Sequence, residues 1–112
     1  MIKAVDRENG TVLGSLIAWG DHPETLWSDN LLVSSDFPHY VRQGVEKGLF
    51  KGDSLAKPGI GGVAVYISGA VGGLMTTHPR LTIKDPFTGE AFKEPTFEKT
   101  EAQGKSLALI AL

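Results

Sequence analysis

The chain has 112 residues and a mass of 12.0 kDa, which is the size of one ordinary domain. Hydrophobic residues make up 41% and charged residues 21%, and this balance is typical of a folded globular domain rather than a disordered one. Eleven Lys and Arg against 13 Asp and Glu give a net charge of −2, so the composition argues against a partner such as nucleic acid or an acidic membrane. The absence of cysteine excludes disulfides, thiolate metal sites and a cysteine nucleophile.

Glycine is unusually frequent, at 14 residues, and six of these glycines fall within residues 59–73. The cluster lies inside residues 58–79, a stretch that contains no Asp, Glu, Lys or Arg. Such a stretch is long enough to span a bilayer, but glycines and polar residues interrupt it, so we expect no transmembrane segment. Residues 1–8 have neither an apolar stretch nor a cleavage pattern, and we expect no signal peptide within this chain.

The chain opens with the pattern of a β-hairpin. Residues 2–5 and 11–19 are rich in strand-forming residues, and the turn between them ends in Asn-Gly, which supplies the positive φ of a tight turn. Residues 12–19 are nearly all apolar, which predicts a strand covered on both faces. Residues 20–35 carry polar groups without regular spacing and predict a long loop just past the end of this strand.

A helix is predicted next. Asp36 is the expected N-cap, Pro38 fits the first turn, and Gly48 is a suitable C-terminal stop. Apolar residues recur at helical spacing between these signals. Gly44 falls on the buried face, which predicts close packing of the helix against the sheet.

A second strand is predicted over residues 63–68, which form a short β-branched run bounded by glycines. Residues 49–62, rich in Lys, Gly, Asp and Pro, indicate a surface connection that leads to it. The order strand, loop, helix, strand places the two strands parallel and adjacent. A second hairpin is expected from residues 81–84 and 91–93, and Thr96 is the expected cap of a helix that runs to the end of the chain.

These elements predict a single α/β domain over residues 1–112, with a small mixed sheet built from a parallel central pair plus hairpins, and with two helices. The last helix ends in the apolar run 107–112, which indicates either truncation or a buried contact with a partner. We therefore expect a homo-oligomer that associates through the C-terminal apolar helix.

The three histidines differ in their contexts. His22 follows a strand end and precedes a proline, and such a turn suits a metal ligand or a general base, because both need a fixed imidazole. The alternative for His22 is a loop histidine bonded to the backbone. His39 shares a helix face with charged side chains, which predicts a solvated position, and His78 would approach His22 if the two strands are neighbours. Asp36 and Glu24 are carboxylates near the same end of the sheet, and the N-cap role is the alternative reading for Asp36.

Glycines follow directly after the second predicted strand. Gly69, Gly72 and Gly73 indicate a backbone that comes close either to another strand or to a buried ligand. Their spacing fits neither the dinucleotide-binding fingerprint nor the P-loop. Ser68 precedes them, but the Gly-x-Ser-x-Gly pattern of a nucleophilic serine is not present.

Two segments together resemble a known family. Residues 19–26 (Trp-Gly-Asp-His-Pro-Glu-Thr-Leu) and 30–38 (Asn-Leu-Leu-Val-Ser-Ser-Asp-Phe-Pro) are similar to the "HPT … N … ISADFPGY" stretch of neutral/alkaline ceramidases and their uncharacterised bacterial relatives. Residues 65–74 (Val-Tyr-Ile-Ser-Gly-Ala-Val-Gly-Gly-Leu) resemble the "FxNGAAGDVxP" stretch of the same family. The resemblance covers about residues 2–80 and, more loosely, the terminal helix.

The resemblance implies a zinc amidohydrolase that cleaves the N-acyl bond of ceramide, a lipid amide, with His22 as one zinc ligand. A zinc ion held there would activate water and polarise the amide carbonyl. The family completes its zinc site with an upstream His-x-His motif and with later Glu and Tyr residues, and it differs from this chain at Gly73 and Met75. Candidates to line the site are Asp36, Ser68, Gly69, Gly72, Gly73 and His78.

Two functional hypotheses follow. In the first, the chain is a segment of a larger ceramidase-like hydrolase domain, incomplete and inactive by itself. In the second, it is a small non-catalytic α/β module for binding or oligomerisation.

Overall fold

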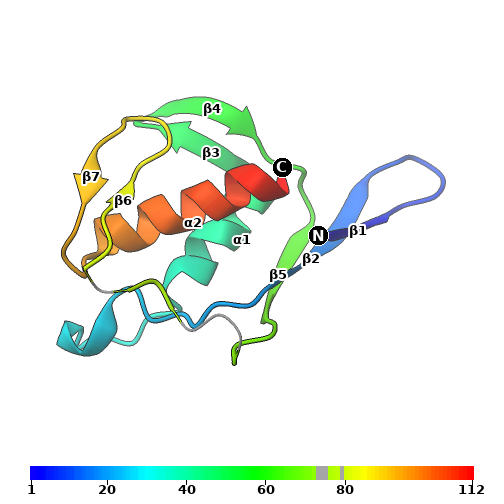
Figure 1. Cartoon of the computed structure of the whole chain (residues 1–112). Helices are drawn as coiled ribbons and strands as arrows, with labels where there is room; N and C mark the ends of the chain where they lie inside the picture. The colour runs from blue at the N-terminus through cyan, green and yellow to red at the C-terminus, as the bar shows by residue number, and fades with distance from the viewer. Residues whose placement is uncertain (73–75, 79) are drawn as a thin grey trace.

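The computed structural model describes residues 1–72, 76–78 and 80–112 (Figure 1). Two helices lie side by side at the centre, a three-stranded sheet lies next to them, and two small hairpins flank the helices. The first hairpin projects away from the helices. This is the predicted α/β class, with a mixed sheet, a parallel pair, additional hairpins and two helices.

The main sheet contains β1 (Ile2–Val5), β2 (Val12–Trp19) and β5 (Val63–Ser68), in the order β1-β2-β5. Strands β1 and β2 pair antiparallel across the predicted hairpin. Strands β2 and β5 pair parallel, as their order around a helix predicted. The carboxyl ends of β2 and β5 therefore meet at the same edge of the sheet.

Helix α1 (Phe37–Lys47) begins and ends at the predicted residues. The Asp36 side chain accepts a hydrogen bond from the Phe37 backbone N–H, and Gly48 follows the last turn with φ 107°. A φ of this sign is strained for residues with a Cβ, which explains the choice of glycine at the stop.

Helix α2 (Phe97–Ala111) begins after Thr96, whose hydroxyl accepts from the Lys99 N–H at 3.3 Å. It packs along α1. A Cβ on Gly44 would lie 2.8 Å from the Cβ of Ala108 in α2 and 2.6 Å from Leu49. The expectation that Gly44 allows close packing on the sheet is thus wrong, because the close neighbours of Gly44 belong to α2 and to the residues that follow α1.

Residues 49–62, expected as a surface connection, are mostly exposed, with Leu49 as the buried exception. The expectation missed an antiparallel pair in this stretch, made of β3 (Gly48–Lys51) and β4 (Ser54–Pro58). The turn between the two strands uses Gly52 at φ 58°, and the frequent Lys and Gly hid the short strands on either side. The second expected hairpin is present as β6 (Ile83–Lys84) and β7 (Ala91–Phe92).

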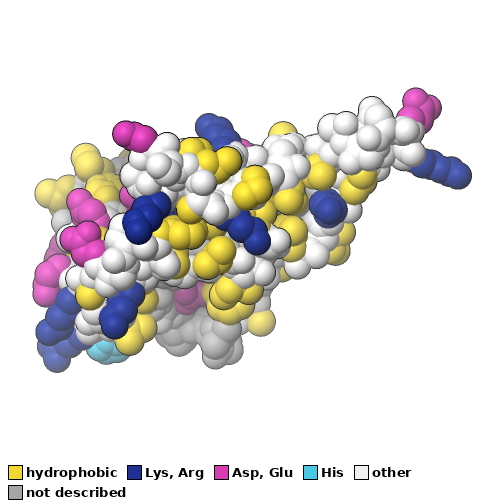
Figure 2. Space-filling view, turned by 90° about the horizontal axis from the view of Figure 1, so that it is seen from above, with side chains coloured by type: hydrophobic (Ala, Val, Ile, Leu, Met, Phe, Trp, Pro, Cys, Tyr) yellow, Lys and Arg dark blue, Asp and Glu magenta, His cyan; other side chains and the backbone are white. Residues whose placement is uncertain are grey.

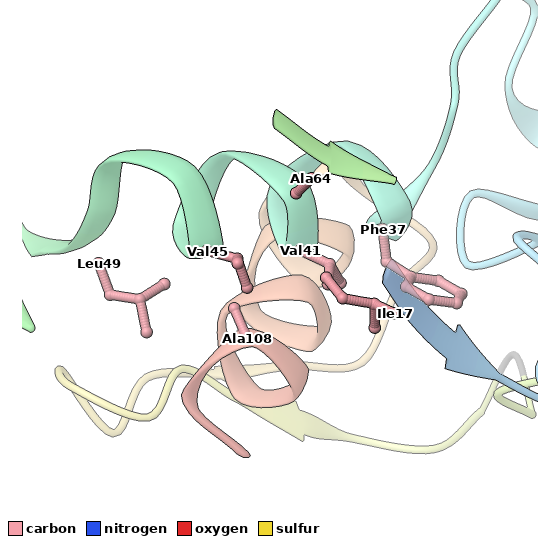
Figure 3. Close-up of a cluster of buried hydrophobic side chains, with 7 residues drawn as sticks. All are labelled: Ile17, Phe37, Val41, Val45, Leu49, Ala64 and Ala108. Atoms are coloured by element: carbon pink, nitrogen blue, oxygen red, sulfur yellow. The ribbon is translucent and has the colours of Figure 1, made fainter. Parts of the chain in front are cut away.

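The hydrophobic core lies between α1, α2 and one face of the main sheet (Figure 3). Its buried members are Ile17, Phe37, Val41, Val45, Leu49, Ala64 and Ala108. The ring of Phe37 meets that of Tyr66 edge to face, with the ring centres 5.7 Å apart. On this face of the sheet, Ile17 of β2 and Ala64 of β5 are buried in the core, and Tyr66 packs against it.

The opposite face of the main sheet is exposed in the described structure. Val63, Val65 and Ile67 alternate with the covered residues of β5 and remain 66%, 49% and 47% exposed. The prediction that residues 12–19 form a strand covered on both faces is wrong in the described structure, because Leu16 is only half-buried and Ala18 is exposed on the face opposite Ile17. Hydrophobic side chains also reach the surface between charged groups in the view of Figure 2.

The apolar C-terminal run divides between interior and surface. Leu107, Ala111 and Leu112 pack against the core, and Ala108 is part of it. Ile110 is 77% exposed and points away from it. Most of the apolar character of the run thus serves the fold of the chain itself.

Candidate functional site

Two loops meet at the carboxyl edge of the parallel pair. The Gly69 N–H donates to the carbonyl of Trp19, the last residue of β2, at 2.9 Å. A Cβ on Gly20 would lie 3.3 Å from the backbone N and O of Ala70. The glycine loop after β5 and the loop that carries His22 therefore pack backbone against backbone, which requires small residues there.

A network of side chains surrounds Asp21 in this region. Its Oδ2 accepts from the Gln103 amide at 3.2 Å and lies 3.5 Å from the Thr77 hydroxyl. The Oε1 of Gln103 in turn accepts from the Thr25 hydroxyl at 2.7 Å. The network joins the loop after β2, the segment 76–78 and helix α2, and sequence reasoning did not foresee it, since Gln103 lies 82 residues from Asp21.

Two groups in this region have shifted pKa values, and burial is the main cause of both shifts. Burial raises the pKa of Asp21 above its ordinary value, although the Thr77 hydrogen bond and the neighbouring His22 oppose the shift, and the charge of Asp36 adds to it. Burial, together with the charge of Asp21, raises the pKa of Tyr66 to about 12, against a smaller opposing effect of its hydrogen bond with Ser68. The Tyr66 hydroxyl also donates to the Trp19 carbonyl at 3.4 Å. The Tyr66 hydroxyl is therefore protonated at neutral pH and acts as a hydrogen-bond donor.

The structure places the histidines differently. His22 is half-buried, and its backbone carbonyl accepts from the Thr76 hydroxyl at 3.3 Å. His78 is exposed, with its Nδ1 accepting from the Arg80 N–H at 3.2 Å. His39 is exposed on α1, as predicted.

The described residues do not complete a zinc site. Within residues 1–72, 76–78 and 80–112, no group of three or more His, Asp or Glu side chains is arranged to hold a metal ion. A structural zinc site needs four ligands and a catalytic one commonly has three from the protein. His22 and its neighbour Asp21 are therefore too few by themselves to form such a site.

Asp36 joins two parts of the site region. Its Oδ1 accepts from the Phe37 N–H at 2.7 Å and its Oδ2 accepts from the Leu26 N–H at 3.0 Å, and the residue is 4% exposed. One carboxylate therefore caps α1 and holds the preceding loop against it. A buried carboxylate with two N–H donors is well compensated for its loss of hydration.

The remaining predicted site residues lie after β5. Ser68 is exposed at the end of the strand. Among the described residues, no heavy atom lies within 4 Å of the position of a Cβ added to Gly72. Gly73, like Met75, lies outside the described residues.

A cleft of about 430 Å³ opens within the loop between β2 and α1. Sequence reasoning missed this cleft, because it depends on how the loop folds back on itself. The side chains that define its character are Glu24, Leu26, Trp27, Leu32, Ser34 and Asp36. The signal in the sequence was the composition of residues 20–36, which contain four Asp or Glu and no Lys or Arg.

In the described residues, no helix has the length and apolar character that crossing a membrane requires. The chain matches no family model, no curated protein and no solved structure.

Proposed function

We propose that the chain is the central α/β part of a ceramidase-like zinc amidohydrolase, with His22 as one of the zinc ligands. The observation that carries the proposal is the position of His22. It is half-buried next to the hydrogen-bonded Asp21, in the loop that leaves the carboxyl edge of the parallel strand pair. This loop packs at Gly20 against Ala70 of the glycine loop after β5. Open α/β sheets place their ligand sites at this edge.

The neighbouring residues have distinct roles in this proposal. Gln103 donates to the Asp21 carboxylate and Thr77 lies within hydrogen-bonding distance of it, so both orient this neighbour of His22. Zinc, when bound, would supply an activated water and a polarised amide carbonyl. The other zinc ligands, and with them the amide or lipid substrate, belong to a longer protein, so the chain by itself is expected to be inactive.

Zinc titration followed by NMR tests this proposal. We expect the ring resonances of His22 to shift at lower zinc concentration than those of His39 and His78, because His22 is half-buried and interacts electrostatically with the adjacent Asp21, whereas His39 and His78 are exposed. His22→Ala should remove the high-affinity phase, whereas His39→Ala, the matched surface control, should retain it. Equal responses of all three rings, or an unchanged titration in His22→Ala, would contradict the proposal.

A second candidate function is a small non-catalytic module that binds a second copy of itself. The exposed apolar face of β5 and the exposed Ile110 favour it. Light scattering should then give a mass above 12.0 kDa, and either Val65→Thr or Ile110→Ser should lower that mass. A monomer at high concentration would exclude this candidate.

A further inference from the structure

The cleft in the loop between β2 and α1 has an unusual charge. Glu24 and Asp36 both line it, and among the described residues no Lys or Arg does. The loop that forms the cleft, residues 20–36, contains four acidic and no basic side chains. This loop therefore carries a local negative charge, which attracts cations.

The same cleft has apolar walls. Leu26, Trp27 and Leu32 line it together with the two acids. An indole ring attracts organic cations through its π face, and alkyl side chains favour a ligand with a hydrocarbon part. An inorganic cation would use the carboxylates but gain nothing from the three apolar side chains.

Two residues that line this cleft have an unusual backbone conformation, with a positive φ angle. Among the described residues, Trp27 (φ 55°) and Asp36 (φ 54°) are the non-glycine residues with positive φ, and both line the cleft. Such conformations are costly and are found preferentially at binding sites and active sites. Here they hold the aromatic ring and the buried carboxylate at the wall of the same cavity.

We propose that this cleft binds a small organic cation, namely a primary ammonium group that carries an alkyl chain. The ammonium group lies toward Glu24 and Asp36, and the alkyl chain lies along Trp27 and Leu32. The volume of about 430 Å³ falls within the range of small-molecule sites. The proposal is independent of the zinc hypothesis, since it uses neither His22 nor Asp21.

The two tryptophans allow a direct test. Trp27 lines the cleft and Trp19 lies at the end of β2, so the two indole N–H signals in an NMR spectrum are a probe and an internal control. We expect hexylammonium to shift the Trp27 signal in a saturable manner and to leave Trp19 unchanged. Hexanol should bind more weakly, and hexanoate should produce no shift.

A pair of charge variants identifies the acid that is responsible. Glu24→Gln and Asp29→Asn each remove one negative charge from the same loop, but only Glu24 lines the cleft. We expect Glu24→Gln to weaken hexylammonium binding roughly three- to fivefold and Asp29→Asn to leave it nearly unchanged at physiological ionic strength.

Four results would overturn the proposal. They are an unshifted Trp27 signal with hexylammonium, equal binding of hexanol and hexylammonium, an equal effect of the two charge variants, and an equal Trp27 shift with calcium chloride alone. The comparison of hexylammonium, hexanol and hexanoate uses the unmodified chain, so it decides the question even if a variant does not fold.

Discussion

The surroundings of two carboxylates, Asp21 and Asp85, shift their pKa values in opposite directions. Asp21 is partly buried, and its pKa is raised mainly by burial. Asp85 is also buried, but hydrogen bonds from the Thr88 and Phe87 N–H groups and from Lys105 outweigh the effect of burial and lower its pKa. The first carboxylate is costly to the fold in its charged form, and the second stabilises the turn between β6 and β7.

We predict that the side chain of Asp85 titrates at a lower pH than that of Asp21. A lowered pKa in the folded state means that Asp85 stabilises the fold above its ordinary value of 3.8 and that this stability is lost as the pH falls through the folded pKa. A raised pKa means that Asp21 favours the fold in its protonated form, and that this contribution is lost as the pH rises through the folded pKa. NMR titration of the two carboxyl carbons measures both, and the reverse order would refute the assignment.

Asp85→Ala should lower the free energy of unfolding by about 1–3 kcal/mol at pH 7, because two backbone N–H groups and Lys105 lose their acceptor. The loss should shrink below pH 4. Asp53→Ala, an exposed matched control, should change the free energy by less than about 0.5 kcal/mol. Urea unfolding at several pH values gives both numbers.

At the scale of elements, close contact between α1 and α2 depends on the absence of side chains. Gly44 of α1 faces Ala108 of α2, and Gly104 of α2 lies against the Cβ of Tyr40 and the carbonyl of Phe37 in α1. The two helices also hold the core between them. Glycine in a helix is ordinarily unfavourable, so its presence at both contacts indicates that packing outweighs helix propensity.

Gly104→Ala should therefore destabilise the protein. In an exposed helix this change stabilises by about 0.5–1 kcal/mol, but here the new Cβ would clash with Tyr40 and lie 2.8 Å from the Phe37 carbonyl. We expect a loss of about 1–3 kcal/mol in the free energy of unfolding.

Gly72→Ala is the comparison, because its new Cβ would meet no atom within 4 Å. Thermal unfolding of the two variants decides the matter, and an increase in the melting temperature of Gly104→Ala would show that the helices are not in close contact there.

At the scale of the whole molecule, the main sheet is covered on one face and exposed on the other. Val45 of helix α1, which packs over the covered face of the sheet, is 0% exposed. Val65 lies on the open face of β5 and is 49% exposed. The in-register pairing of β2 with β5 puts every second residue of both strands on that open face. A mixed sheet with a bare apolar face is available for a further layer of structure or a partner.

The variants Val45→Thr and Val65→Thr make the same chemical change on the covered and on the open side of the sheet. The difference between their free energies of unfolding measures how differently the two sides are buried. Val45→Thr buries a hydroxyl in an apolar core and should cost about 1–3 kcal/mol. Val65→Thr should cost less than about 1 kcal/mol, because its hydroxyl reaches solvent and threonine suits a strand. Similar losses in chemical denaturation would show that the open face is covered in solution.

The sequence alone determined the elements with strong local signals. Asp36 and Gly48 set the bounds of α1, Thr96 set the start of α2, and the β-branched run of β5 fixed the second strand. These signals succeed because caps, turns and short apolar runs act within a few residues of one another. The order of the elements then determined the parallel pairing of β2 and β5.

Only the tertiary structure decided which surfaces meet. It paired Asp21 with Gln103, turned Gly44 toward α2 rather than the sheet, and folded residues 20–36 around an acidic cleft. Each of these features depends either on contacts between residues distant in the chain or on unusual φ angles in a loop. Such contacts and such φ angles produce no periodic pattern in the sequence. The tertiary structure also decided that only one face of the main sheet is covered in the described structure. An apolar run in the sequence shows that a strand can be buried, but it does not show whether a helix packs on it.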